Sequence, residues 1–154
     1  MNITVRVQTQ DFNVDDELLL LRQQGNQVGA IVNFIGVMRD LNEDTHVTTL
    51  ELEHYPGMTE KSITDIIEQA KQRWQLLGAT VIHRVGIMIP SDQIVLVAVS
   101  SLHRGEAFQA CEFIMDFLKT QAPFWKKELT SNGERWLDAR TADQRACERW
   151  LEAQ

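Results

Sequence analysis

A proline at position 123 marks a change of periodicity in the chain, and this change constrains the fold more than any other feature. Apolar residues recur at helical spacing over residues 104–120, which predicts a long helix. Proline cannot readily continue that helix, and it pushes the residue before it towards an extended conformation. Residues 123–130 (PFWKKELT) therefore predict a short strand, and the turn at residues 131–133 followed by residues 134–140 (ERWLDAR) predicts a hairpin.

The rest of the chain also mixes strand and helix patterns. Apolar runs or alternation predict strands at residues 3–7, 29–38, 47–55, 79–86 and 93–101, and spacing and capping residues predict helices that begin near residues 13, 59 and 141. We expect the strand at 29–38 to be buried, the polar stretch at 39–46 to be a loop, and Thr59 to cap its helix. Together the patterns predict an α+β fold in which residues 1–154 form a single domain, with an antiparallel or mixed sheet, packing helices, and a C-terminal β-hairpin plus helix.

The composition excludes several classes of protein. The chain has 154 residues, 44% of them hydrophobic and 24% charged, which is typical of one globular domain and not of a disordered or fibrous protein. Its net charge of −7 argues against general binding to nucleic acid or to a membrane surface, because both require a cationic face. We find no apolar core of a signal peptide and no run long enough to span a bilayer, so we expect a soluble cytoplasmic protein.

The two cysteines do not indicate a metal site or a disulfide framework. Cys111 and Cys147 lack the CxxC or Cys/His spacing of zinc sites. Cys111 falls on the apolar stripe of the helix at 104–120, so a buried structural thiol is the better interpretation. We also find no Ser-His-Asp order, nucleophile elbow or glycine-rich phosphate loop. We therefore expect neither a metal nor a bound cofactor.

Two lysines near Pro123 indicate a site for an anion. Lys119 lies in the last predicted helical turn, and Lys126 lies on the strand that follows the proline. On that strand Phe124, Lys126 and Glu128 share one face, so the two lysines can converge on one pocket. A lysine whose pKa is lowered by burial and by a neighbouring cation can transfer protons near neutral pH. The alternative is that Lys119 only complements the helix dipole and that both lysines are solvated.

A second cationic feature lies at the start of the long helix. His103 and Arg104 stand where a strand gives way to a helix N-terminus, which attracts anions through its free N–H groups. Arg39 opens the polar stretch that follows a predicted strand. Each of the three would also be ordinary as a boundary or surface residue. From the residues alone we predict an anion-binding pocket in an otherwise acidic protein.

Four blocks of sequence, in this order and spacing, resemble one known family. They are LEHYPGMTEK (52–61), VIHRVG (81–86), His103-Arg104 and FIMDFLKTQAPFWKKE (113–128). Together they are similar to the large, catalytic subunit of molybdopterin synthase, the MoaE family, over nearly the whole chain. The resemblance implies an α/β hammerhead-like form of the α+β fold. It also implies an enzyme, a sulfurtransferase.

The implied reaction is a step of molybdenum-cofactor biosynthesis. In that step cyclic pyranopterin monophosphate becomes molybdopterin by gaining two sulfurs as a dithiolene. The sulfur arrives on the C-terminal thiocarboxylate of a small ubiquitin-like partner, whose tail enters a pocket of the large subunit. The implied assembly is a heterotetramer built on a homodimer of large subunits. A phosphate and a thiocarboxylate held close together would explain why an acidic chain gathers lysines.

The resemblance also assigns roles to individual residues. Lys119 matches the principal catalytic lysine, and Lys126 matches a second one. The positions that match substrate-binding residues are Val37, Met38, Arg39, His103, Arg104, Lys119, Lys126, Lys127, Glu128 and Arg140, the last contributed across the dimer. Phe34 and Met115 would form the pocket wall, although both would also suit a plain core. Lys127 stands where many relatives have Arg, so the charge is kept but bidentate geometry is lost.

Two alternatives stay open at this point. The chain could be a non-catalytic scaffold that binds a ubiquitin-like sulfur carrier by its tail. It could also be a nucleotide- or phosphate-binding module. Turnover that depends on Lys119 would separate the enzyme from the scaffold, and tight binding of ordinary nucleotides would favour the phosphate-binding module.

Overall fold

Two β-sheets and four helices make up the part of the chain that the structure describes. The structure is a computed structural model, and it describes residues 1–42, 44–137 and 141–152. The strands are β1 (Asn2–Gln8), β2 (Ala30–Val37), β3 (Leu41–Asn42), β4 (Thr45–His54), β5 (Leu76–Arg84), β6 (Gly86–Met88), β7 (Gln93–Ser101), β8 (Phe124–Thr130) and β9 (Gly133–Leu137). The helices are α1 (Val14–Arg22), α2 (Met58–Arg73), α3 (Arg104–Gln121) and α4 (Thr141–Glu152).

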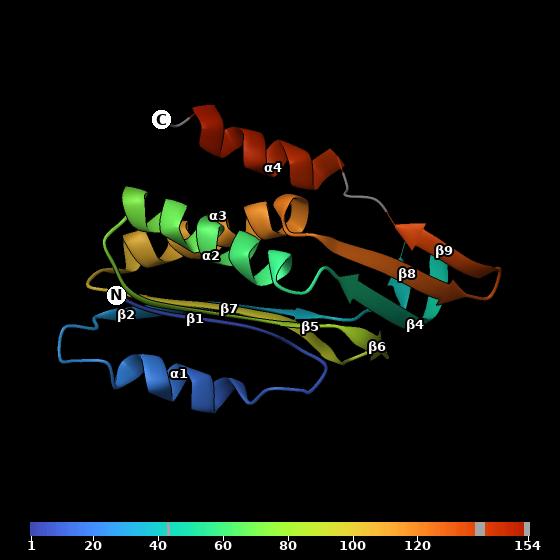
Figure 1. Ribbon diagram of the computed structural model, residues 1–154, viewed down its shortest axis with the longest axis horizontal. Helices are drawn as coiled ribbons and strands as arrows, with labels where there is room; N and C mark the ends of the chain where they lie inside the picture. The colour runs from blue at the N-terminus through green and yellow to red at the C-terminus, as the bar shows by residue number, and fades with distance from the viewer. Residues whose placement is uncertain (43, 138–140, 153–154) are drawn as a thin grey trace.

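The first sheet forms the central layer, with the strand order β1-β5-β7-β2. β1 runs parallel to β5, while β5, β7 and β2 pair antiparallel, so the sheet is mixed. Figure 1 shows α1 below this sheet, α2 and α3 above it, and α4 above α3. The α+β class predicted from the sequence is confirmed, including the mixed sheet, the packing helices and the C-terminal hairpin followed by a helix.

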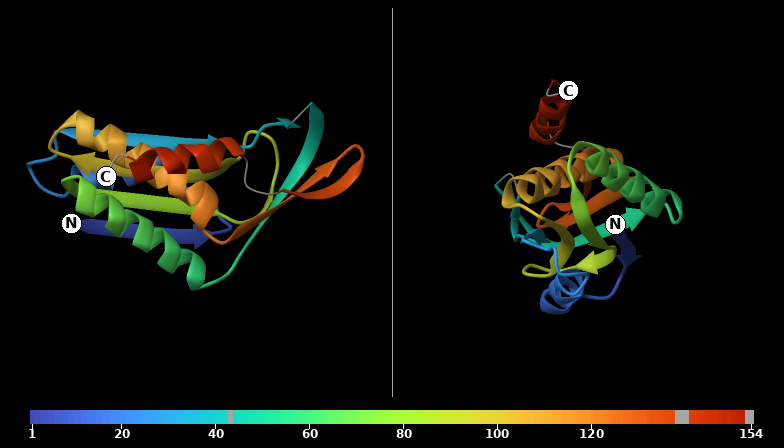
Figure 2. Two further views of the ribbon diagram at one scale, coloured as in Figure 1. Left: turned by 90° about the horizontal axis from the view of Figure 1, so that it is seen from above. Right: turned by 90° about the vertical axis from the view of Figure 1, so that its left-hand side faces the viewer.

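The second sheet projects from one end of the first, as Figures 1 and 2 show. Its strand order is β3-β4-β8-β9, and β6 also pairs with β4. β8 and β9 form the hairpin that the sequence after Pro123 predicts, with Lys126 opposite Leu137. β4 pairs antiparallel with β8, which sets His54 opposite Phe124. This pairing brings β4, which is far from β8 in the sequence, next to the strand that follows α3.

Helices α2 and α3 cover one face of the first sheet with apolar side chains at helical spacing. Ile63 and Ile67 of α2 and Ile114 of α3 are fully buried in this core. Burying a side chain of this size stabilises a fold by about 1.5–3 kcal/mol. The α3 stripe predicted from the sequence is buried in the same cluster: it consists of Ala107, Cys111, Ile114, Met115 and Leu118. Because this core fixes the rotation of α3 about its axis, it also fixes where the last turn of α3 points.

α4 packs on the outer side of α3, as Figure 2 shows. The ring of Trp150 meets that of Phe113 edge-on, with ring centroids 5.5 Å apart. Trp150 Nε1 donates a hydrogen bond of 2.6 Å to Oδ2 of Asp116. Cys147 Sγ donates to the backbone oxygen of Asp116 at 3.0 Å. These contacts anchor α4 on the C-terminal half of α3.

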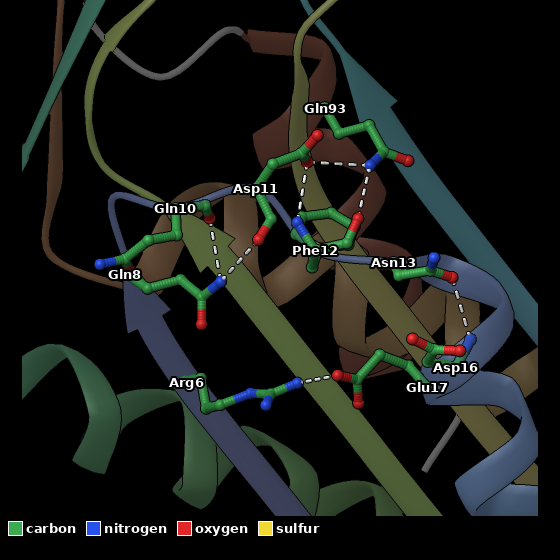
Figure 3. A network of polar contacts seen from close by, with 9 residues as sticks. All are labelled: Arg6, Gln8, Gln10, Asp11, Phe12, Asn13, Asp16, Glu17 and Gln93. Atoms are coloured by element: carbon green, nitrogen blue, oxygen red, sulfur yellow. Dashed lines mark hydrogen bonds and ion pairs between the residues drawn. The ribbon is translucent and has the colours of Figure 1, made fainter.

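α1 covers the other face of the first sheet, and polar contacts fix its start (Figure 3). Asn13 caps the helix, since its Oδ1 accepts a hydrogen bond from the backbone N–H of Asp16. Asp11 Oδ1 accepts from Gln93 Nε2 at 3.0 Å and from the backbone N–H of Phe12 at 2.8 Å. These two hydrogen bonds, the one from Gln93 first, lower the pKa of Asp11 below its usual value. They tie the segment before α1 to the start of β7.

The prediction that the strand at 29–38 is buried is wrong. β2 lies at an edge of the first sheet and pairs only with β7 among the described strands. Phe34 and Val37 are 41% and 48% exposed. An apolar run looks the same in a sequence whether it faces a core or the wall of a cavity. Here the end of β2 faces a cavity, which is described below.

Two further local expectations are also corrected. The described part of the stretch at 39–46 is not an open loop, because β3 pairs with the start of β4 and sets Leu41 opposite His46. Gly57, not Thr59, is the N-cap of α2. The Thr59 hydroxyl donates instead to a backbone oxygen of the preceding turn, at 2.9 Å. A strand of two residues, such as β3, is too short to show the alternation of apolar and polar residues by which strands are predicted.

Gly29 offers a test of the packing at the start of β2. A Cβ at this position would overlap the backbone oxygen of Leu102, so no side chain fits unless the backbone moves. We predict that Gly29→Ala lowers the free energy of unfolding by about 1–3 kcal/mol, measured by urea denaturation. Gly105→Ala in α3 is the control, because nothing lies within 4 Å of an added Cβ there, and it should be neutral or stabilising. Equal effects of the two substitutions would contradict the steric explanation.

Candidate active site

A cavity of about 430 Å³ lies where the C-terminal end of α3 meets the end of β2 and the second sheet. Its lining comes from segments that are far apart in the sequence: β2 and the residues after it, β4, β5, β7, the end of α3, β8, Leu137 of β9 and Asp143 of α4. Its volume falls within the range of small-molecule sites, which is about 300–1,000 Å³. The two sheets and α3 thus build one recess together.

Lys119 and Lys126 both line this cavity. Lys119 lies in the last turn of α3. Ala122 then adopts an extended backbone, with φ −75° and ψ 135°, and the chain continues into β8. Side chains alternate along β8, so Phe124, Lys126 and Glu128 all reach the cavity. The structure therefore brings the two predicted catalytic lysines to one recess, where their catalytic role stays a prediction.

Five more of the predicted residues lie around the same cavity. Val37, Met38 and Arg39 come from the end of β2 and the residues after it, and Phe34 and Met115 belong to the wall. Phe34 is 41% exposed and Met115 is 8% exposed, so Phe34 is the more accessible of the two. Arg39 adds a guanidinium group, which is the best side chain for bidentate binding of a phosphate. Contact with a substrate stays a prediction for all five.

His103 and Arg104 lie far from this cavity within one chain. They stand at the N-terminal end of α3, whereas Lys119 stands at its C-terminal end. At roughly 1.5 Å per residue, these ends are about 22 Å apart along the helix axis. Arg140 lies outside the described residues. The binding of these three residues to a substrate stays a prediction.

Lys127 does not line the cavity and makes its contacts on the opposite face of β8. Its Nζ lies 3.2 Å from a carboxylate oxygen of Glu51 and 3.8 Å from one of Glu134. The same atom lies 5.4 Å from the centre of the Trp136 ring. The hydrogen bond with Glu51 is the main reason that the pKa of Lys127 is raised above its usual value. These contacts account for the charge of Lys127 without a substrate.

Glu128 belongs to the cavity wall, but its carboxylate already has partners. The residue is 4% exposed. Its Oε1 accepts a hydrogen bond of 2.5 Å from Asn42 Nδ2, and its Oε2 accepts one of 3.0 Å from Arg135 Nε. These bonds join β3, β8 and β9. Glu128 therefore holds the wall of the cavity together, and its negative charge is paired with Arg135.

His83 on β5 also lines the cavity, although it was not among the predicted site residues. Its Nδ1 donates to the backbone oxygen of Arg84 at 2.8 Å, and its ring stacks on Phe124 with centroids 3.8 Å apart. Burial lowers the pKa of His83 to about 3, and the charges of Lys126 and Lys119 add to this shift. His83 is therefore neutral at physiological pH. A lone histidine in an apolar strand is typical of a core residue, so the sequence pattern does not predict its place at the cavity.

Neither cysteine offers a reactive thiol to this cavity. Burial raises the pKa of the Cys111 thiol to about 12. Burial is also the main cause of the raised pKa of Cys147. Within the described ranges there is no group of three or more His, Cys, Asp or Glu residues suited to a metal ion, and no helix there is long and apolar enough to cross a membrane. The charged donors around the cavity are the ammonium groups of the lysines and the guanidinium group of Arg39.

The hydrogen bonds of Glu128 with Asn42 and Arg135 predict that the protein loses stability when the charge of Glu128 is removed. Glu128→Gln should lower the free energy of unfolding by about 1–3 kcal/mol, because it replaces charge-assisted hydrogen bonds in a buried position. Urea denaturation measures the loss. Glu134→Gln is the matched control on the next strand, since its side chain is 64% exposed, and its effect should stay below about 0.5 kcal/mol. Unchanged stability with a loss of substrate affinity alone would show that Glu128 acts by binding substrate.

The neutral state of His83 predicts a dependence of stability on pH. The unfolded chain binds a proton at this side chain near its ordinary pKa of 6.5, whereas the folded protein does so only near 3. His83 therefore costs the wild type stability as the pH falls through this range. We predict that the difference in unfolding free energy between His83→Phe and the wild type moves in favour of the variant between pH 7 and pH 4. A difference that is constant over this range would contradict the burial of a neutral ring.

The chain is similar to one protein family in both sequence and fold. The family model described as MoaE protein matches residues 7–121. The molybdopterin synthase catalytic subunit of Ralstonia nicotianae is 59% identical over 147 residues, which cover 96% of this chain and 84% of that protein. The solved structure of a molybdopterin biosynthesis MoaE protein from Burkholderia ambifaria is 50% identical and has a TM-score of 0.84, over 98% of this chain and 99% of that chain.

A more distant structure shares the fold. It is a complex of subunits 1 and 2 of molybdopterin-converting factor from Helicobacter pylori, matched at 21% identity and a TM-score of 0.67 over 90% of this chain and 91% of that chain. The family assignment rests on the closer matches, since the family model and the Ralstonia relative each cover most of the chain. The chain belongs to the MoaE protein family.

Proposed function

We propose that this chain is the catalytic subunit of a molybdopterin synthase. It transfers sulfur from the C-terminal thiocarboxylate of a small ubiquitin-like partner to cyclic pyranopterin monophosphate, and this forms the dithiolene of molybdopterin. The chain is then a sulfurtransferase of molybdenum-cofactor biosynthesis. The observation that carries the proposal is the cavity in which Lys119 and Lys126 lie together, in a chain of the MoaE family.

The reaction needs a site that holds two anions close together, a phosphate and a thiocarboxylate. Two like charges 4 Å apart repel by about 4 kcal/mol at an effective dielectric constant of about 20. Lys119, Lys126 and Arg39 supply positive charge around one cavity. Charges that are in place before the substrates arrive offset this repulsion, and they also stabilise charge that develops during the reaction.

Each of these cations suits a different task. The Lys119 ammonium group can compensate the thiocarboxylate and exchange a proton as sulfur is transferred, so we assign the principal catalytic role to it. Lys126 is more buried than Lys119 and serves as the second lysine of the pair. The planar guanidinium group of Arg39 fits a phosphate in a bidentate manner. Phe34 and Met115 give the ring system of the pterin an apolar wall.

A partner that delivers the sulfur explains why no thiol of this chain is reactive. The raised pKa of Cys111 and its burial are then without consequence for the reaction. The Helicobacter pylori structure is a complex of two subunits, which supports a partner of this kind. We propose a heterotetramer with two copies of this chain at its centre and one small subunit at each end. The free thiols also fit a cytoplasmic location.

The central dimer would give a task to residues that lie away from the cavity. His103 and Arg104 are separated from Lys119 by most of the length of α3. If they bind substrate, as the family resemblance predicts, a second copy of the chain has to present them. The family resemblance likewise predicts that Arg140 binds substrate in the cavity of the other copy.

Reconstitution with a thiocarboxylated small subunit and cyclic pyranopterin monophosphate tests the proposal. We predict that Lys119→Ala lowers the rate of dithiolene formation by at least about a hundredfold, because it removes a charge and a proton donor from the cavity. Binding of the small subunit, measured by titration calorimetry, should change little. Lys61→Ala is the matched control, since this ammonium group lies on α2, is 71% exposed and pairs with Asp65. It should leave the rate unchanged.

Two results would contradict the proposal in different ways. No dithiolene from the wild type would overturn the enzyme assignment, and retained binding of the small subunit in that case would favour the non-catalytic scaffold. Turnover that survives Lys119→Ala would leave the enzyme assignment intact but would show that another group carries the chemistry.

A further inference from the structure

His83 is a buried imidazole to which the proposed reaction gives no task. It is 6% exposed and lines the cavity together with Phe124, Lys119 and Lys126. An apolar side chain would fill the same space without the loss of stability at low pH that a buried histidine brings. The residue therefore raises the question of what its ring nitrogen atoms contribute.

The hydrogen bond at Nδ1 fixes the tautomer of the ring. Nδ1 lies 2.8 Å from the backbone oxygen of Arg84. A carbonyl oxygen can only accept, so Nδ1 carries the proton and donates it. In the neutral ring Nε2 then has a lone pair and no proton, so it can only accept. With Nδ1 engaged by Arg84, Nε2 is the ring atom that can accept a hydrogen bond from a donor in the cavity.

The two lysines lie close enough to act on this ring. Phe124 stacks on His83 with an angle of 20° between the ring planes, and Lys126 follows on the same face of β8. After burial, the positive charges of Lys126 and then Lys119 lower the pKa of His83. His54 lies further from Phe124, with ring centroids 6.5 Å apart, and it does not line the cavity. His83 and the two lysines thus line one cavity, and the lysine charges act on the imidazole.

We propose that His83 is a positioning residue for Lys126: its Nε2 accepts a hydrogen bond from the ammonium group and holds that group towards the anions in the cavity. The proposal rests on the proposed function and adds a residue to it. A lysine ammonium group sits on a flexible four-carbon chain. Fixing its direction before the substrates arrive lowers the barrier, because misplacement by about 1 Å can reduce a rate by about a hundredfold.

A neutral acceptor suits this task better than a carboxylate. A carboxylate beside Lys126 would cancel the positive charge that the two anions require. Imidazole directs the ammonium group and leaves its charge in place. Because burial holds the pKa of His83 near 3, the ring keeps its lone pair throughout the physiological pH range.

A purely structural role for His83 is the competing explanation, and it uses different atoms. Stacking on Phe124 needs only a flat ring, which His83→Phe retains. The bond to the backbone oxygen of Arg84 needs only a donor near Nδ1, which the amide of His83→Asn supplies. The acceptor at Nε2 is lost in both variants. His83→Gln places an amide oxygen further from the backbone, near the position of Nε2.

The test compares these three variants in the reconstituted assay, with His54→Asn as the matched control. We expect His83→Asn and His83→Phe to lower kcat by about tenfold to a hundredfold, with KM for cyclic pyranopterin monophosphate changed by no more than about twofold. His83→Gln should recover most of the lost rate, and His54→Asn should retain the wild-type kcat. Melting temperatures of all four variants show whether a lost rate follows lost stability.

A second measurement does not depend on turnover. In protein that carries isotope-labelled lysine, the Nζ resonance of Lys126 is assigned by its absence in Lys126→Ala. We expect this resonance to shift in His83→Asn and to stay in place in His54→Asn. The shift would show that His83 acts on the ammonium group and not only on the packing of Phe124.

The outcomes separate this proposal from the proposed function. An active wild type with unchanged kcat in all three His83 variants would overturn the positioning role. A rate that falls equally in all three variants, with a lower melting temperature and an unmoved Lys126 resonance, would overturn it in favour of the structural role. A wild type without turnover would overturn the proposed function, and the Lys126 resonance would still decide whether His83 holds this lysine.

Discussion

The change from helix to strand at Pro123 is the constraint on which the cavity depends. The proline ring removes a backbone donor and clashes with the preceding turn, so α3 ends just beyond Lys119. The pairing of β8 with β4 then decides which side chains return towards the end of the helix. Because alternation along a strand is strict, the arrangement that turns Lys126 towards the cavity also turns Lys127 away from it, where Glu51 holds it.

The lysines of the cavity belong to a protein whose net charge is −7, and two residues of the wall bear on their charge. Glu128 lies in the wall of the cavity, but its carboxylate is bonded to Asn42 and Arg135. His83 lines the same cavity as Lys126 and is neutral because it is buried. Glu128 therefore helps to build the wall of the cavity, and His83 directs Lys126 in the role proposed above. Such an arrangement suits a reaction in which two anions must meet.

The sequence was sufficient where structure depends on local periodicity. The end of α3 and the hairpin of β8 and β9 follow from Pro123 and from alternation, and the structure has both. The sequence was insufficient where the burial or the role of a residue depends on partners that are distant in the chain. The apolar run of β2 reads the same at an edge facing a cavity as in a core. His83 gains significance only beside Phe124 of another strand, and His103 and Arg104 would act at the cavity only in the proposed assembly of two copies.

α4 supports the end of α3 that carries Lys119. Trp150 is bonded to Asp116, one turn before Lys119, and Cys147 Sγ lies 3.1 Å from the hydroxyl oxygen of Thr120. Local unfolding of a helix starts at its ends. Without support, the last turn of α3 would fray, and the position of Lys119 would vary. Changes at Trp150 or Cys147, neither of which lines the cavity, would thus alter the position of Lys119 through the rigidity of a single helical turn.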